Sequence, residues 1–155
     1  MWNEKGTKCT YNFPQDNKVN NFQAVQWLSE ACKKFHYDIV VTSTWRWDEN
    51  YKECLINGGL RSGIEILGRT KEIRDQCRGF EIKTYLKEHP EINYYVIIDD
   101  DCDMLDEQLD NFIQTCGDKI YTPNLYINNE GSGLTEKLMN KAIDILNGNT
   151  KETNN

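Results

Sequence analysis

Apolar residues along the chain follow two patterns, helical spacing and short uninterrupted runs. Apolar positions three and four residues apart predict helices, and they cover about residues 20–34, 48–57, 80–88, 105–112 and 135–146. Runs of β-branched, aromatic and aliphatic residues predict buried strands at 37–41, 64–67 and 94–98, and a weak one at 120–121. Strands that alternate with helices predict an α/β fold in which right-handed crossovers build a parallel sheet.

The 155 residues are enough for one domain with a sizeable core. We expect an irregular segment at 1–19, the α/β domain at 20–147 and a disordered tail at 148–155. No apolar run reaches membrane-spanning length and the N-terminus lacks the apolar core of a signal peptide, so the expected location is cytoplasmic, without a membrane partner. Six scattered cysteines, without a paired spacing or a histidine cluster, indicate neither a zinc site nor a redox motif. The sequence does not indicate an oligomeric state.

An acidic stretch directly follows the strand at 94–98. Four aspartates, at 99, 100, 101 and 103, lie within five residues and would repel one another without a cation or hydrogen-bond donors among them. Open α/β sheets bind ligands at the carboxyl ends of their strands, and carboxylate oxygens suit Mg²⁺. The alternative is a solvated acidic loop or helix start, where aspartate is common.

Two further polar features accompany the acids. Thr42, Ser43 and Thr44 follow the strand at 37–41, and the basic residue Arg78 opens a helix. Hydroxyls and backbone N–H groups can donate to phosphate oxygens, a guanidinium offsets the charge of a transferring phosphoryl group, and carboxylates hold Mg²⁺ against it. Together these features predict a phosphate site. An ordinary strand-end hydroxyl and a solvated helix-start arginine are the alternatives for Thr42 and Arg78. The net charge of −7 excludes a clamp on a long nucleic-acid backbone and leaves a small phosphorylated end as a partner.

Four motifs carry a family resemblance when they are read in order. They are Val40-Val41-Thr42-Ser43-Thr44-Trp45-Arg46, Arg78-Gly79-Phe80-Glu81-Ile82, Val96-Ile97-Ile98-Asp99-Asp100-Asp101-Cys102-Asp103 and Gly133-Leu134-Thr135. In this order the chain resembles the haloacid dehalogenase (HAD) superfamily over about residues 20–147, most of all the HAD domain of multi-enzyme RNA-repair proteins. The resemblance implies a three-layer, Rossmann-like parallel sheet without a large cap domain.

The same resemblance implies roles for individual residues. Thr42 would bind the phosphoryl group, with the Ser43 N–H beside it, and Arg78 would steady the nucleophile and the phosphate. Lys71 and Arg74 are alternatives to Arg78. Two further sets complete the site: Mg²⁺ on Asp99 and Asp100 with Asp103 behind them, and a substrate contact from Arg46. The implied reaction is hydrolysis of a phosphomonoester through an aspartyl-phosphate, on a phosphorylated small molecule or a nucleic-acid end.

The sequence departs from the family pattern at its beginning. Members of this superfamily start with a strand that ends in Asp-x-Asp, whose first aspartate is the nucleophile, and residues 1–20 contain no such strand. The family pattern places it upstream of Met1, at the centre of the sheet. Three explanations stay open: a truncated form of an active phosphatase, which we favour, a non-catalytic phosphate- or metal-binding module, and an unrelated α/β protein. We expect the chain as printed to have little or no turnover.

Overall fold

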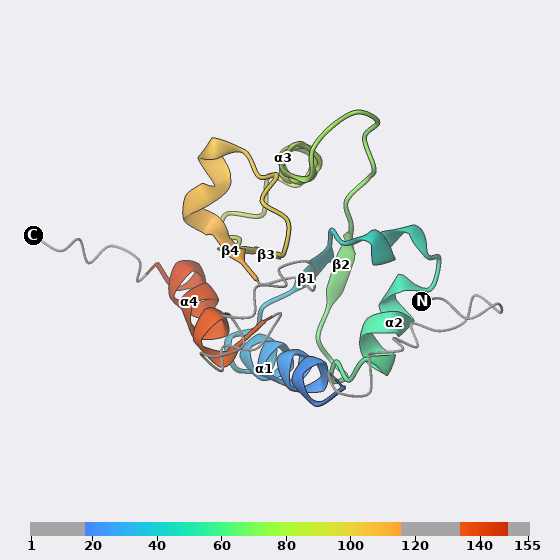
Figure 1. Ribbon diagram of the computed structural model, residues 1–155, viewed down its shortest axis with the longest axis vertical. Coiled ribbons are helices and arrows are strands. Elements are labelled where there is room, and N and C mark those ends of the chain that lie inside the picture. The colour runs from blue at the N-terminus through green and yellow to red at the C-terminus, as the bar shows by residue number, and fades with distance from the viewer. Residues whose placement is uncertain (1–17, 116–133, 149–155) are drawn as a thin grey trace, which may run out of the picture. The chain divides into compact units, whose positions relative to one another are not determined.

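The computed structural model describes residues 18–115 and 134–148, which belong to two compact units, Met1–Thr70 and Lys71–Asn155 (Figure 1). Each unit contains one pair of strands and the helices that pack on it. The two units are described one after the other. In the described part of the chain, no helix is both long and apolar enough to cross a membrane.

The first unit is built on the parallel strands β1 (Ile39–Val41) and β2 (Ile66–Arg69). Ile39 lies opposite Ile66 and Val41 opposite Arg69, with a bulge between Ile39 and Val40. The connection between the strands consists of a 3-10 helix, η2 (Thr44–Trp47), and the helix α2 (Tyr51–Asn57). The long helix α1 (Lys18–Phe35) precedes β1. A strand, a helical crossover and a parallel strand form the βαβ unit that the alternating pattern predicts.

A small apolar core holds the first unit together. Val41, Leu60 and Ile66 are buried, and Val25 of α1 and Leu55 of α2 pack against them. The coil before β2 is joined to α1 by a hydrogen bond in which the Arg61 N–H donates to the buried Ser29 hydroxyl at 3.2 Å. These contacts fix the end of β1, where the predicted phosphate-binding residues begin.

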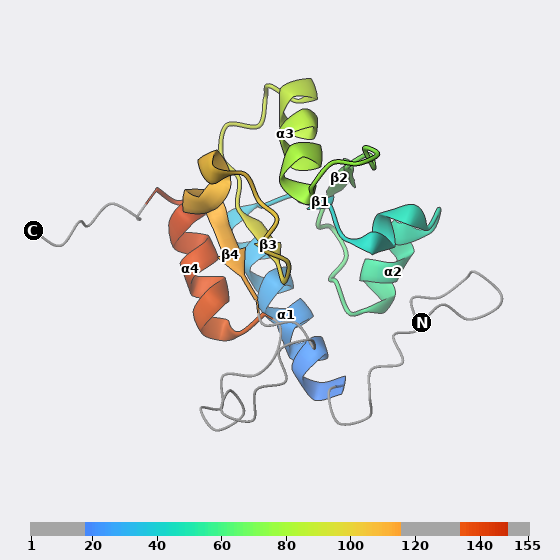
Figure 2. The same ribbon diagram turned by 45° about the horizontal axis from the view of Figure 1, so that its top comes forward.

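The second unit is built on the parallel strands β3 (Ile97–Asp99) and β4 (Phe112–Gln114). Ile97 lies opposite Phe112 and Asp99 opposite Gln114. The helix α3 (Arg78–Glu88) precedes β3, and a 3-10 helix, η3 (Asp106–Asn111), leads into β4. The last helix, α4 (Glu136–Leu146), lies beside β4 (Figure 2). Its first turn is capped by Thr135, whose hydroxyl accepts from the Leu138 N–H at 3.2 Å.

The structure confirms the small α/β fold with parallel strands, and the described residues contain no large cap. Several elements differ from the sequence predictions. The strands predicted at 37–41 and 94–98 are the shorter strands Ile39–Val41 and Ile97–Asp99, and the 3-10 helix η2 was not predicted. The strand predicted at 64–67 runs from Ile66 to Arg69, and the helix predicted at 105–112 is a 3-10 helix that gives way to β4, which was not predicted. Of the irregular segment predicted at 1–19, residues 1–17 lie outside the described residues, whereas residues 18 and 19 already belong to α1. The weak strand predicted at 120–121 and residues 149–155 of the predicted tail also lie outside the described residues. The division into one domain at 20–147 and a tail stays a prediction.

Candidate phosphate and metal site

The acidic stretch forms a tight loop at the end of β3. Carboxylate oxygens of Asp99, Asp100 and Asp101 all lie within 4.8 Å of one another. Asp99 Oδ1 accepts a hydrogen bond from the Asp101 N–H at 3.0 Å, which folds the loop back over the strand end. Asp99 is largely buried, whereas Asp100 and Asp101 are exposed. Oxygen ligands at this spacing are chemically suited to a hard divalent cation such as Mg²⁺.

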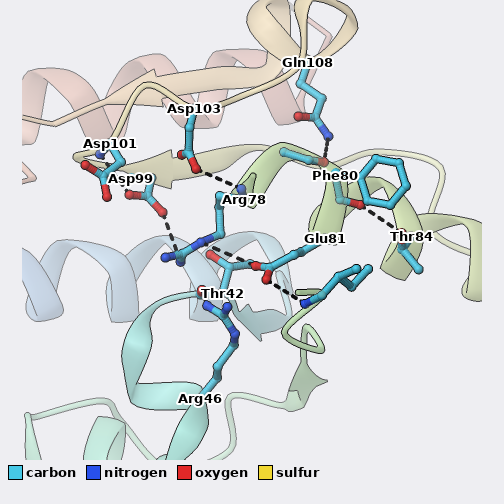
Figure 3. A network of polar contacts seen from close by, with 12 residues as sticks. Thr42, Arg46, Arg78, Phe80, Glu81, Thr84, Asp99, Asp101, Asp103 and Gln108 are labelled. Atoms are coloured by element: carbon cyan, nitrogen blue, oxygen red, sulfur yellow. Dashed lines mark hydrogen bonds and ion pairs between the residues drawn. The ribbon is translucent and has the colours of Figure 1, made fainter. Parts of the chain in front are cut away.

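The Arg78 side chain lies between two buried carboxylates (Figure 3). Its Nη1 is 3.5 Å from Asp99 Oδ2, and its Nε is 3.7 Å from Glu81 Oε2. The side chains of Arg78, Asp99 and Glu81 are 14%, 9% and 5% exposed, so water screens these charges only weakly. Glu81 is itself held in place, because its Oε1 accepts from the Ile73 N–H at 3.0 Å. The guanidinium is therefore fixed beside the acidic loop.

The beginning of α3 is bound to the same loop through the backbone. Asp103 Oδ2 accepts from the Arg78 N–H at 2.9 Å, and the Asp103 carbonyl oxygen accepts from the Gly79 N–H at 3.1 Å. The N-cap residue Cys77 makes no side-chain cap of its own, so Asp103 supplies the acceptor and the negative charge that a helix start favours. The buried Gln108 donates from Nε2 to the Gly79 carbonyl at 2.8 Å and accepts from the Leu105 N–H at 3.0 Å.

In the first unit, the predicted phosphate-binding residues form a turn after β1. The Arg46 N–H donates to the Ser43 carbonyl at 2.9 Å, which closes the first turn of η2. The Arg46 guanidinium is buried and donates to the Thr42 carbonyl oxygen (Figure 3). Arg69 of β2 also contacts the turn: its Nη1 donates to the carbonyl oxygens of Arg46 at 2.6 Å and Asp48 at 3.0 Å. The hydrogen bonds from Arg46 and Arg69 hold the backbone of this turn in place.

We compared the sequence with models of known protein families. The family model described as "HAD domain in Swiss Army Knife RNA repair proteins" matches residues 3–119, well over half of the chain. The chain belongs to this HAD domain family. The matched range contains the strand ends at Thr42 and Asp99 and the start of α3 at Arg78. Searches of curated proteins and of solved structures found no significant match.

Within each unit, this HAD domain brings together residues that the sequence predicts for one site. Arg78, Asp99 and Asp100 meet in the second unit, and Thr42, Ser43 and Arg46 in the first. Their roles stay predictions. The predicted metal residue Asp103 accepts from the start of α3, and the substrate contact predicted for Arg46 concerns a side chain that is buried. The alternatives Lys71 and Arg74 pair with Glu88 and Asp75 on the surface.

Three residues to which the sequence analysis assigned no individual role take part in this arrangement. Asp101 completes the carboxylate cluster, Glu81 holds Arg78, and Gln108 joins α3 to the acidic loop. The spacing of three between Arg78 and Glu81 on a predicted helix is a signal that could have revealed their ion pair. Gln108 carries no comparable signal, because a glutamine among acidic residues reads as a surface position.

Burial of Asp99 makes the stability of the HAD domain depend on pH. Burial is the largest cause that raises the pKa of Asp99 above its ordinary value of 3.8, and the nearby Asp100 raises it further. The Asp101 N–H and Arg78 oppose this rise. The folded state therefore binds this proton more tightly than the unfolded state, and the contribution of Asp99 to stability falls as pH rises from 3.8 through the raised pKa.

We expect Asp99→Asn to remove this loss of stability with rising pH. Urea unfolding of both proteins at a series of pH values above 3.8 measures the difference between their free energies of unfolding. The wild-type protein should lose stability relative to Asp99→Asn as pH rises, because only aspartate ionises. A difference that stays constant with pH, or grows in favour of the wild type, would show that the Asp99 carboxyl is not disfavoured as an ion.

Proposed function

We propose that this HAD domain serves the Mg²⁺-dependent hydrolysis of phosphomonoesters. The observation that carries the proposal is the Arg78 guanidinium, held 3.5 Å from Asp99 beside two further carboxylates at a strand end. A fixed cation next to a set of metal-binding oxygens suits a reaction in which negative charge must be stabilised on a phosphoryl group. We propose that the protein carries out this reaction in the cytoplasm.

The proposed roles of the residues follow from their chemistry. Asp99 and Asp100 would hold Mg²⁺, which supplies charge neutralisation at the phosphoryl oxygens when it is bound. The Thr42 hydroxyl and the Ser43 N–H would donate to phosphoryl oxygens, and Arg78 would balance the charge of the nucleophile and the phosphate. Action of these two sets of residues on one phosphoryl group stays a prediction from the sequence. The nucleophile would be the first aspartate of an Asp-x-Asp strand, which the printed sequence does not contain at its beginning.

A phosphorylated nucleic-acid end is the substrate class that we favour over a phosphorylated small molecule. The matching family is named for RNA repair proteins, and a terminal phosphate requires only a local site. The net charge of −7 is unsuited to binding a long backbone but compatible with a single chain end held through Mg²⁺. The described residues contain no large cap that would exclude a bulky substrate.

The test is hydrolysis of an aryl phosphate with Mg²⁺ by the natural full-length protein, after its start codon has been identified by reading the genomic sequence around and upstream of the codon for Met1. Asp100→Asn should lower kcat/KM by about 100-fold, because a metal-binding carboxylate becomes a weaker, neutral ligand. The control is Asp110→Asn, an exposed residue of η3, which should retain full activity. Full activity of Asp100→Asn would remove Asp100 from the site.

A non-catalytic phosphate- or metal-binding module is the second candidate function, because the cluster of Asp99, Asp100 and Asp101 with the Arg78 guanidinium beside it is suited to binding a metal ion and an anion without a nucleophile. This alternative requires that the full-length protein binds Mg²⁺ and phosphate without hydrolysing any ester. Calorimetric binding together with the aryl phosphate assay separates the two candidates: binding with turnover supports the phosphohydrolase, and binding without turnover supports the module.

A further inference from the structure

The hydroxyl of Thr70 has no hydrogen-bond partner among the residues that the structure describes. Thr70 directly follows β2 and is 2% exposed. Its backbone is well paired, because the Thr70 N–H donates to the Val41 carbonyl at 3.0 Å. A buried hydroxyl loses its hydrogen bonds to water, and folded proteins ordinarily replace them with internal partners. An unpaired hydroxyl at this depth therefore requires an explanation.

The position of Thr70 in the strand pair supplies that explanation. Val41 lies opposite Arg69, so the next step along both chains places Thr42 opposite Thr70. Side chains that face each other across parallel strands point to the same side of the sheet. Both threonines then lie at the carboxyl end of the β1–β2 pair, which is the end where open α/β sheets bind ligands.

The second strand pair ends in the same way, at the acidic cluster. Thr115 is the residue after β4, and its N–H donates to the carbonyl of Asp99 at 2.8 Å. In the same way, Thr70 is the residue after β2, and its N–H donates to the carbonyl of Val41. In each pair, a buried threonine after the second strand is therefore hydrogen-bonded to the last residue of the first strand. In the second pair that last residue is the inner member of the candidate metal site. By this correspondence, Thr70 lies at the end of the β1–β2 pair where we expect a ligand to bind.

We propose that the Thr70 hydroxyl is a second phosphate donor, which acts beside Thr42 on an oxygen of the bound phosphoryl group. This inference rests on the proposed function, since it takes Thr42 as a phosphate-binding residue. A hydroxyl that is buried and unpaired in the unliganded protein donates to an anionic oxygen without first breaking an internal hydrogen bond. The ligand class is a tetrahedral oxyanion, either a phosphomonoester or inorganic phosphate.

The experiment measures binding of inorganic phosphate to the full chain in the presence of Mg²⁺, by calorimetry and by the phosphate-dependent shift in Tm. Thr70→Val replaces the hydroxyl with a methyl group of similar size and should weaken phosphate binding by about tenfold. Thr70→Ser keeps the hydroxyl and should bind within about twofold of the wild type. Thr84→Val is the control, because the Thr84 hydroxyl already donates to the Phe80 carbonyl at 2.9 Å on α3. Phosphate affinity should be unchanged in this variant.

The Tm without phosphate gives an independent readout. If the hydroxyl is unpaired in the unliganded protein, Thr70→Val should keep or raise the Tm. A lower Tm would show that the hydroxyl has a structural partner and would overturn the proposal. Unchanged phosphate binding in Thr70→Val, with weakened binding in Thr42→Val, would overturn the role of Thr70 alone. Failure of the wild-type protein to bind phosphate with Mg²⁺ would overturn both this inference and the proposed function.

Discussion

Replacing Arg78 with methionine should lower the free energy of unfolding by about 3 kcal/mol at pH 7. Methionine preserves most of the length and apolar volume of the side chain, so the packing changes little. The charge does change, because Asp99 and Glu81 would lose the guanidinium that lies 3.5 and 3.7 Å from them. Both carboxylates are more than nine-tenths buried, and their remaining backbone donors, the Asp101 and Ile73 N–H groups, would not replace the lost counter-charge, so much of the cost of desolvation would be uncompensated.

Urea unfolding at two pH values would measure this effect and identify its cause. Near neutral pH the loss should be largest. It should shrink as the pH falls through the raised pKa of Asp99, since a protonated carboxyl no longer needs a counter-charge. Arg74→Met is the matched control: Arg74 pairs with Asp75 on the surface, where both side chains are about nine-tenths exposed, and its loss should leave stability unchanged. An equal loss at both pH values would assign the effect to packing rather than charge.

Substitution of Gly79 by alanine should also destabilise the fold strongly. A Cβ at this position would lie 2.6 Å from the Leu105 backbone nitrogen and 2.9 Å from the Met104 Cα. Backbone atoms cannot move aside as the end of a side chain can, so α3 and the acidic loop would have to separate. Helix propensity alone would favour alanine by up to about 1 kcal/mol. Overpacking costs typically about 1–3 kcal/mol, and separation would also stretch the hydrogen bonds from Arg78 and Gly79 to Asp103.

The net expectation for Gly79→Ala is a loss of about 2 kcal/mol in the free energy of unfolding, measured by chemical denaturation. Gly148→Ala provides the comparison. No atom lies within 4 Å of a Cβ built at Gly148, so only the strain of its φ of +74° contributes, and this should cost about 1 kcal/mol. A neutral or stabilising result for Gly79→Ala would mean that the acidic loop yields to the helix, and that their contact does not fix Arg78.

The hydrophobic pattern predicted the helices α1 to α4 and the strands β1 to β3, and it missed the strand β4. The helix predicted at 20–34 matches α1, and the run of aliphatic residues before Asp99 marks β3. In contrast, Leu105, Leu109 and Phe112 recur at helical spacing, although Phe112 begins the three-residue strand β4. A strand this short shows no alternation of its own, so its pairing with β3 decided the local structure.

The candidate site shows the same limit of sequence reasoning. The aspartate run and the motif order indicate the acidic loop and favour Arg78 over Lys71 and Arg74. They do not indicate what holds these residues. Asp103 was predicted as a metal-binding group, and this role stays a prediction. The sequence did not indicate that its carboxylate accepts from the start of α3, a helix without a side-chain cap from its own N-cap residue. Contacts between residues distant in sequence, such as Gln108 with Gly79, require the fold.

The charge balance around the acidic loop has a consequence for the order in which ligands arrive. Among the described residues, the Arg78 guanidinium lies beside Glu81 and Asp99, and three further carboxylates, of Asp100, Asp101 and Asp103, belong to the same acidic loop. At neutral pH this neighbourhood carries an excess of negative charge and repels a phosphate dianion. A divalent ion entering first would reverse that repulsion. A phosphohydrolase of the kind that we propose would therefore bind its ligands in a fixed order, the metal ion before the substrate. Its apparent affinity for substrate would rise with the concentration of Mg²⁺.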